Sequence, residues 1–150
     1  MRSWSGSLRA AGTAVLAVAA LGVLTACSRA ADAPDTSSSL LRLYEHHASN
    51  EEVEASGTVR KVLGTRLTRS GNHEGFIVEV PVPLTSQSLR VKIEDNVDIS
   101  GSIPLAAGDR VHFRGEYVYD SRGGIVHWTH HDPRMRHEPG FIEVNGKRYS

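Results

Sequence analysis

Residues whose side chains can do chemistry gather in one stretch, from His127 to His137. It reads His-Trp-Thr-His-His-Asp-Pro-Arg-Met-Arg-His and contains four of the eight histidines of this 150-residue chain. Imidazole and carboxylate groups are common ligands of divalent transition metals, and imidazoles beside a tryptophan also suit a small-molecule or peptide site. This stretch is therefore the first candidate for a functional site.

The spacing of these residues limits which of them could share a metal ion. On an extended strand, residues i and i+2 lie about 7 Å apart on one face, whereas residues i and i+4 are about 13 Å apart. His127 and His131 therefore cannot bind one ion on a straight strand, whereas His130 and Asp132 can. A divalent transition metal is thus a hypothesis that needs a bend in the chain, and its candidate ligands are His127, His130, Asp132 and His137.

Motifs that would specify an enzyme are missing from the sequence. It has no HExxH, no CxxC and no GxSxG, and Gly123-Gly124 is followed by a strand pattern rather than by the helix that a phosphate-binding loop needs. We therefore assign no catalytic residue and no cofactor. Three interpretations stay open: Trp128 packing on the domain while the histidines bond the surrounding loop, a small-molecule or peptide site, and a metal site.

Polar residues in two other segments could complete a ligand site with this stretch. His73 lies in a turn, and Asn96 and Asp98 open a long connection between two strands. We expect the three segments to meet, as polar groups of a binding site commonly come from distant parts of the chain. The candidate ligand-binding residues are His73, Asn96, Asp98, His127, Trp128, His130, His131 and Asp132.

The N-terminal segment has the pattern of a bacterial lipoprotein signal peptide over residues 1–26. Two arginines precede an apolar run of about 15 residues, which is shorter than the roughly 20 that a membrane-spanning helix needs. The run ends in Leu24-Thr25-Ala26-Cys27, which resembles a lipobox and implies cleavage before Cys27 and acylation of that residue, with palmitate as a typical chain. An uncleaved anchor helix, or an ordinary secreted protein, stays open as an alternative.

This segment sets the expected domain organisation and location. Residues 27–39 are small and polar, which is typical of a lipid anchor followed by a flexible tether, and residues 40–150 form the domain. The protein is thus expected to be a lipoprotein of the cell envelope, bound to the membrane by its lipid, with its domain outside the cytoplasm. Its further partner would be a small molecule or an envelope protein.

Charge and cysteine content exclude other classes. The full chain has 17 basic and 17 acidic residues, and removal of residues 1–26 leaves 15 basic and 17 acidic ones. Nucleic-acid binders need a basic surface, so this balance disfavours them. The one cysteine cannot form an internal disulfide. Arg134, Arg136, Lys147 and Arg148 form a local basic cluster, which is more often a solvated face than a site.

The hydrophobic pattern predicts one short helix followed by strands. Residues 37–39 can cap a helix whose apolar face carries Leu40, Leu41, Tyr44 and His47. From residue 53 the hydrophobic period is 2, and strands are expected over residues 57–67, 76–82, 89–94, 111–114, 116–119, 125–129, 141–144 and 147–149. This pattern predicts a mainly β fold, a small antiparallel OB-like β-barrel preceded by one short N-terminal helix, with an open sandwich as the alternative.

Several strings of the domain resemble the DUF3465 family of small exported bacterial proteins. They are Gly57-Thr58-Val59, His73, Phe76-Ile77-Val78, Gly115-Glu116-Tyr117, the string from Gly123 to Pro133, His137 and Asn145-Gly146-Lys147-x-Tyr149. The resemblance covers residues 40–149. It differs at Asp95, where the family usually has histidine, and at Glu74, where it usually has glutamine. Since the family has no assigned activity, the resemblance implies the domain and its exported location, but no mechanism.

Three functions follow as hypotheses. The first is a binding module that recognises a ligand or partner through the His/Trp stretch. The second is a metal-dependent envelope hydrolase that uses His127, His130 and Asp132. The third, an OB-type nucleic-acid binder, is disfavoured by the charge balance.

Overall fold

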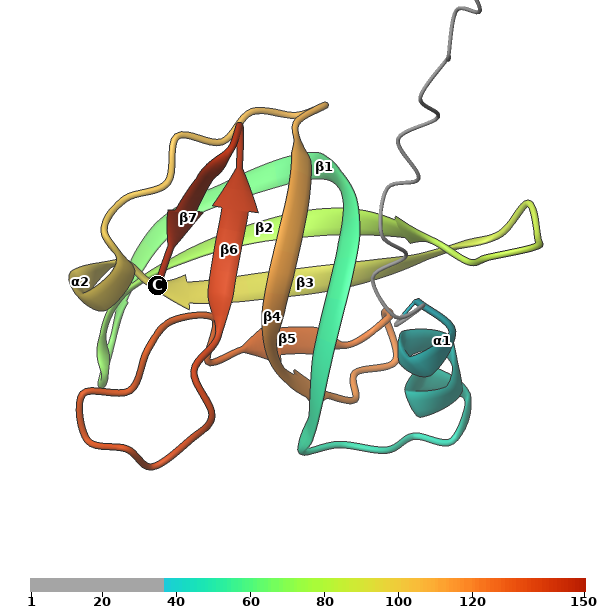
Figure 1. Cartoon of the computed structure of the whole chain (residues 1–150), viewed down its shortest axis with the longest axis horizontal. Coiled ribbons are helices and arrows are strands. Elements are labelled where there is room, and N and C mark those ends of the chain that lie inside the picture. The colour runs from blue at the N-terminus through green and yellow to red at the C-terminus, as the bar shows by residue number, and fades with distance from the viewer. Residues whose placement is uncertain (1–36) are drawn as a thin grey trace, which may run out of the picture. The chain divides into compact units, whose positions relative to one another are not determined.

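The computed structural model describes residues 37–150, which form two helices and seven strands (Figure 1). The predicted signal peptide (residues 1–26), lipid anchor at Cys27 and most of the tether lie outside the described residues. Within residues 37–150, no helix has the length and apolar character needed to cross a membrane. The elements are α1 (Ser37–Glu45), β1 (Glu51–Thr68), β2 (Gly71–Pro81), β3 (Ser88–Asn96), α2 (Val97–Ser100), β4 (Arg110–Val118), β5 (Ile125–His127), β6 (Phe141–Val144) and β7 (Lys147–Tyr149).

Five of the strands pair in a closed ring of order β1-β2-β3-β5-β4, because β1 also pairs with β4. The hairpin of β6 and β7 extends the sheet from β4, next to the part of β4 that pairs with β5. The mainly β fold, with one short helix before an OB-like ring of strands, is as predicted. One pairing differs from the antiparallel prediction: β3 and β5 run parallel, which the long connection through β4 allows.

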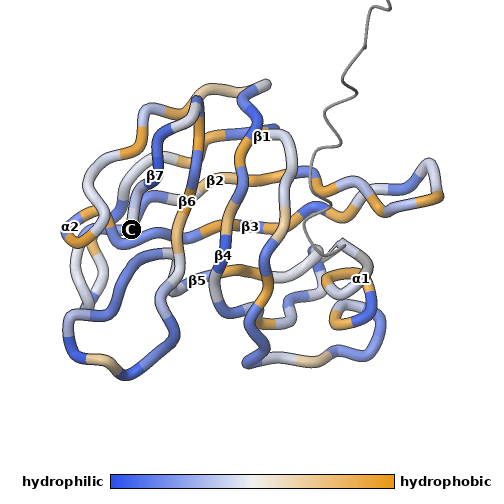
Figure 2. Tube along the Cα trace, in the orientation of Figure 1, coloured by the Kyte–Doolittle hydropathy of each residue, from blue (hydrophilic) through white to orange (hydrophobic). Residues whose placement is uncertain are grey.

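The core fills the ring with side chains from alternate strand positions. Leu89, Val91 and Ile93 of β3 point inward, as their alternation with charged residues predicts, and Phe113 and Tyr117 of β4 do the same. Apolar colour runs along these strands in Figure 2, whereas the connection from β5 to β6 is mostly hydrophilic. Burial raises the pKa of Tyr117 to about 12, and its hydroxyl donates to Gly123 O at 3.3 Å.

The predicted N-terminal helix packs on the domain through part of its expected face. Leu40 is fully buried, and the hydroxyl of Tyr44 donates to Ser121 O at 3.1 Å. His47, predicted on the same face, is exposed, because α1 ends at Glu45 and His47 has a φ of 53°, outside the helical region. Its ring lies 4.3 Å from that of Tyr119.

Three connections lie at one side of the ring and bring the candidate site residues together (Figure 1). They are the turn between β1 and β2, the short helix α2 after β3, and the connection from β5 to β6. The predicted long connection after residue 96 begins with α2, whose first turn is capped by Asn96, with Asn96 Oδ1 accepting from Asp98 N at 3.1 Å. β5 ends at His127, two residues earlier than predicted, because Trp128 has a φ of 56° and turns the chain out of the strand.

Candidate functional site

A pocket of about 590 Å³ opens at this side of the ring, and we call it the His/Trp pocket. A second hollow of about 350 Å³ shares Ser70, His73, Asn96, Trp128 and His130 with it. Most of its lining side chains are polar or charged, and Ile99, Trp128 and Pro133 are the apolar ones. Polar groups that converge on one cavity are a feature of small-molecule sites. Its walls are Arg69, Ser70, His73, Asn96, Ile99, Trp128, His130, Asp132, Pro133, Arg134 and Arg136.

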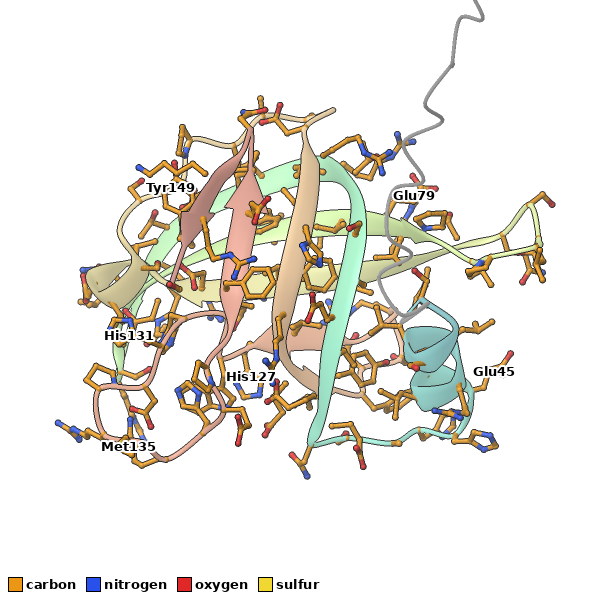
Figure 3. The ribbon with its side chains drawn as sticks, viewed as in Figure 1. Glu45, Glu79, His127, His131, Met135 and Tyr149 are labelled. Atoms are coloured by element: carbon orange, nitrogen blue, oxygen red, sulfur yellow. The ribbon has the colours of Figure 1, made fainter. Side chains whose placement is uncertain are left out.

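The structure thus brings together most of the candidate ligand-binding residues and leaves two aside. His73, Asn96, Trp128, His130 and Asp132 line the His/Trp pocket, and His127 lines the second hollow. Asp98 and His131 line neither and are exposed. Figure 3 shows His127 at the end of β5, with His131 and Met135 farther along on the connection to β6.

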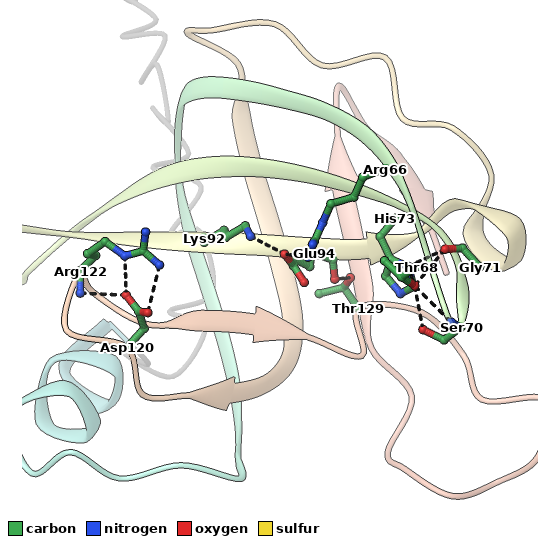
Figure 4. A network of polar contacts seen from close by, with 10 residues as sticks. All are labelled: Arg66, Thr68, Ser70, Gly71, His73, Lys92, Glu94, Asp120, Arg122 and Thr129. Atoms are coloured by element: carbon green, nitrogen blue, oxygen red, sulfur yellow. Dashed lines mark hydrogen bonds and ion pairs between the residues drawn. The ribbon is translucent and has the colours of Figure 1, made fainter.

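Asp98 holds the turn between β1 and β2 rather than facing a pocket. Its carboxylate accepts from Asn72 N at 2.8 Å and from Asn72 Nδ2 at 3.0 Å, and these bonds lower its pKa. In the same turn, the hydroxyl of Thr68 bonds Gly71 O and the ring of His73 (Figure 4). The turn that carries Arg69 is therefore fixed by side-chain bonds. The prediction that His73 lies in the turn is wrong, because β2 already begins at Gly71 and His73 pairs with Arg66 of β1.

Trp128 stands between the pocket and two imidazole rings. Its ring is stacked on that of His137, with centroids 4.4 Å apart, and lies 5.0 Å from that of His127. The left-handed backbone of Trp128 is costly for a residue with a Cβ, and such conformations often cluster at ligand sites. His137, a candidate metal ligand, therefore supports the tryptophan from outside the pocket lining.

The histidines of the pocket have a defined orientation. His130 Nδ1 lies 2.6 Å from His131 O, and His73 Nδ1 lies 3.1 Å from Gly71 O. Since a carbonyl oxygen only accepts, each of these bonds needs the proton on Nδ1, which leaves Nε2 of the neutral ring as an acceptor. Burial lowers the pKa of His130, so that this ring is neutral at pH 7.

Two further imidazole nitrogens are buried without a hydrogen-bond partner among the described residues, Nε2 of His127 and Nε2 of His137. His127 Nε2 lies 3.2 Å from Glu116 Oε1 without the alignment of a hydrogen bond, and His137 Nε2 lies 3.9 Å from Asp132 Oδ2. Burial lowers the pKa of His127, against the opposing effect of Glu116. Unpaired buried nitrogens are costly, so packing alone does not explain these two rings.

Asp132 organises the wall formed by residues 132–136. Its side chain is only 1 % exposed, and its carboxylate accepts from Arg134 N at 2.8 Å and from Arg136 N, with the Arg136 guanidinium 3.4 Å away. Burial alone would raise the pKa of Asp132, but these hydrogen bonds and the Arg136 charge hold it well below its usual value. The carboxylate is thus satisfied within its own loop and serves as a structural part of the pocket.

The metal hypothesis gains no support from the geometry. Within residues 37–150, no three His, Cys, Asp or Glu side chains come together in a way that could hold a metal ion. The bend that such a site required does occur at Trp128, and the ring of His137 lies 5.3 Å from that of His130 and stacks on Trp128, but His130, Asp132 and His137 do not form a shared ligand set.

Comparison with known families decides the classification. Residues 21–150 match the family model described as "Protein of unknown function (DUF3465)", which covers most of the chain. The chain belongs to the DUF3465 family. Searches of curated proteins and of solved structures found no match. The resemblance predicted from the sequence strings is thereby confirmed for the DUF3465 domain, and the classification brings no activity with it.

The sequence analysis interpreted Arg134 and Arg136 as part of a solvated basic face and did not single out Arg69, but all three line the His/Trp pocket. Arg134 and Arg136 line it, whereas Lys147 and Arg148, which are close to them in sequence, lie on β7 next to aromatic rings. Arg69, from the turn between β1 and β2, completes the basic wall. No signal in the sequence joins residue 69 to residue 134, because only the ring of strands places the two connections side by side.

Asp95 is a second residue that the site prediction left out, although the strand period marks it. It continues the inward positions 89, 91 and 93 of β3 and is fully buried, where it accepts from Thr129 Oγ1 at 2.7 Å and from Ser100 Oγ. Burial raises the pKa of Asp95, against the effect of these two hydroxyl donors. The carboxylate ties the residue after Trp128 to the end of β3.

Asp95→Asn is expected to retain or increase stability at pH 7, whereas Asp95→Ala should cost about 1–3 kcal/mol, because alanine leaves two hydroxyls without their acceptor. Because the pKa of Asp95 is higher in the folded protein than in the unfolded chain, its protonated carboxyl contributes stability. This contribution is complete below the ordinary pKa of aspartate and is lost as the pH rises through the pKa of the folded protein. The free energy of unfolding of the wild type should therefore rise relative to that of Asp95→Asn as the pH falls from 7 toward 4, as measured by urea unfolding. An unchanged difference between the two proteins over this range would contradict the expectation.

Proposed function

We propose that this DUF3465 protein is a ligand-binding module of the cell envelope, which captures a small molecule in the His/Trp pocket. The observation that carries the proposal is the convergence of three distant connections on one cavity of about 590 Å³. The strained backbone of Trp128 and the unpaired Nε2 of His137 support it, because strain and unpaired buried groups are retained where they serve a function.

The proposal can be tested through Trp128 itself. The chain has two tryptophans, so Trp4→Phe leaves Trp128 as its only one whether or not residues 1–26 are removed, and its fluorescence then reports on the pocket. The full chain carrying Trp4→Phe is titrated with a panel of sugars, amino acids, organic acids, phosphate esters and short peptides. We expect at least one compound to change the emission saturably.

Matched histidine variants separate pocket binding from other effects. His130→Gln should weaken binding of the active compound about ten-fold, because a buried polar partner is lost. His46→Gln, at an exposed histidine after α1, should leave the affinity unchanged. The absence of any saturable change across the panel, or equal effects of the two variants, would refute the proposed function.

The envelope location is a separate part of the proposal and rests on the lipobox-like Leu24-Thr25-Ala26-Cys27. Wild-type protein produced in a bacterial host is expected to start at Cys27 and to carry acyl chains, whereas Cys27→Ser should carry none and keep residues 1–26. Intact-mass spectrometry and incorporation of labelled palmitate measure both. A wild-type chain without any acyl mass would refute the lipid anchor and leave the pocket proposal untouched.

No observation on residues 37–150 favours the metal-dependent hydrolase, since these residues bring no set of three ligands together. The ligand-binding module is therefore the function that we propose.

A further inference from the structure

Two arginines face the His/Trp pocket without an ionic partner among residues 37–150. Arg69 and Arg134 line it and form no ion pair there, whereas the third arginine, Arg136, is paired with Asp132. A guanidinium is always charged, and its planar fork of N–H donors matches the oxygens of a phosphate or carboxylate. The two arginines come from different connections and line one cavity.

The other walls of the pocket add no charge that would oppose an anion. The carboxylate of Asp132 is occupied by the N–H groups of Arg134 and Arg136 and by the Arg136 guanidinium. Once Arg136 is paired with Asp132, the charges of two arginines remain in the pocket, although residues 37–150 as a whole hold 14 basic and 15 acidic residues. The positive charge is local to this cavity, and clefts of one sign attract ligands of the other.

We propose that the His/Trp pocket binds the phosphate group of its ligand, with Arg69 and Arg134 clamping the oxygens from the two sides. This inference rests on the proposed binding function and names the chemical class of the ligand. A phosphate monoester fits better than a carboxylate because it offers three terminal oxygens, enough for two guanidinium forks at once, and a phosphate diester offers two on a tetrahedral centre that the forks can approach from different sides. Ile99 and Pro133 in the same lining leave apolar surface for the body of the ligand.

A phosphate group could come from a soluble ester or from a phospholipid headgroup. Two exposed apolar side chains lie within two residues of these arginines in the sequence. They are Leu67, which is 79 % exposed, and Met135, which is 92 % exposed. Such exposed apolar residues next to arginines are typical of surfaces that touch the membrane interface. The experiment therefore needs one arm for each source of the same group.

Both arms use the full chain carrying Trp4→Phe in phosphatidylcholine vesicles, with Trp128 emission as the readout. In the soluble arm, glycerol 3-phosphate is titrated, and glycerol serves as the matched probe without phosphate. In the lipid arm, half of the phosphatidylcholine is replaced by phosphatidylglycerol. Arg69→Gln and Arg134→Gln remove one charge each from the pocket, and Arg110→Gln removes one from an exposed position at the start of β4.

We expect a saturable change with glycerol 3-phosphate at a dissociation constant below about 1 mM, or a change with phosphatidylglycerol alone, which would identify the lipid source. Arg69→Gln and Arg134→Gln should each weaken the effect about ten-fold, and Arg110→Gln should not, because only direct charge-assisted bonds are lost. The inference is overturned if neither probe acts or if the three variants behave alike. Binding of a compound without phosphate in the panel described above, with no response here, would overturn this inference and leave the binding function standing.

Discussion

Tyr117→Ala is expected to lower the free energy of unfolding by about 3–5 kcal/mol, the largest effect of any variant considered for this domain. The side chain of Tyr117 is fully buried in the ring of strands and is the largest of the fully buried ones. Alanine would leave a cavity between β4 and the turn at Gly123-Gly124, because the Tyr117 ring lies against Gly124. Urea unfolding followed by circular dichroism measures the loss.

Tyr117→Phe provides the matched control. It keeps the ring and removes only the hydroxyl, which donates to Gly123 O at 3.3 Å, so that the expected loss is about 0.5–1.5 kcal/mol. The comparison shows whether the volume of the ring or its hydrogen bond supports the fold. Equal losses for the two variants would contradict the assignment of the main effect to packing.

Gly123→Ala is expected to cost about 2–5 kcal/mol, from the left-handed backbone and from overlap with a neighbouring strand. Gly123 has a φ of 121°, and a Cβ there would overlap the backbone carbonyl oxygen of Arg90 in β3, with its carbon 2.9 Å away. The turn at Gly123-Gly124 leads into β5, and Lys92 N of β3 bonds Gly124 O at 3.0 Å. The chain can therefore relieve the overlap only by moving β5 away from β3.

Gly146→Ala separates the two causes. Gly146 also has a positive φ, 74°, but no atom lies within 4 Å of the Cβ that alanine would add. Its expected cost is therefore about 1–2 kcal/mol, that of the backbone conformation alone. Thermal and urea unfolding of the two variants give the comparison, and a Gly123→Ala loss no larger than that of Gly146→Ala would show that β3 and β5 accommodate the methyl group.

Tyr117→Ala and Gly123→Ala both change the packing of the turn before β5, and β5 leads directly into Trp128 of the pocket. A folded Gly123→Ala protein with displaced β5 should show altered Trp128 emission on the Trp4→Phe background, whereas Gly146→Ala should not. The position of the binding residues thus depends on the packing of a glycine turn that does not itself line the cavity.

Much of the fold was predictable from local pattern. The alternation at residues 89–94 predicts a half-buried strand, and β3 buries the expected side chains. Asn145-Gly146 predicts the hairpin of β6 and β7. The end of β5 was not predictable, since Trp128 adopts a backbone conformation that is uncommon for its residue type. Nor was the parallel pairing of β3 with β5, because strand direction depends on which edges meet.

The candidate site was predictable in part for a similar reason. Chemical type and local density single out residues 127–132, and His73 and Asn96 indeed line the same cavity. Asp98 was included because its carboxylate looks available, whereas in the structure it is engaged by Asn72. Arg134 and Lys147 look alike in the sequence, and only one of them faces the pocket.

The sequence by itself determined the mainly β class of this protein, its membership of the DUF3465 family and the stretch of chain that holds most of its reactive side chains. Those properties follow from residue type and period, which act over a few neighbouring residues. The tertiary structure alone decided that Arg69 and Arg134 line the same cavity, that Asp132 is satisfied within its loop, and that His137 stacks on Trp128. These relations arise because closure of the ring by β1 and β4 brings distant connections to one side, which local propensity does not encode.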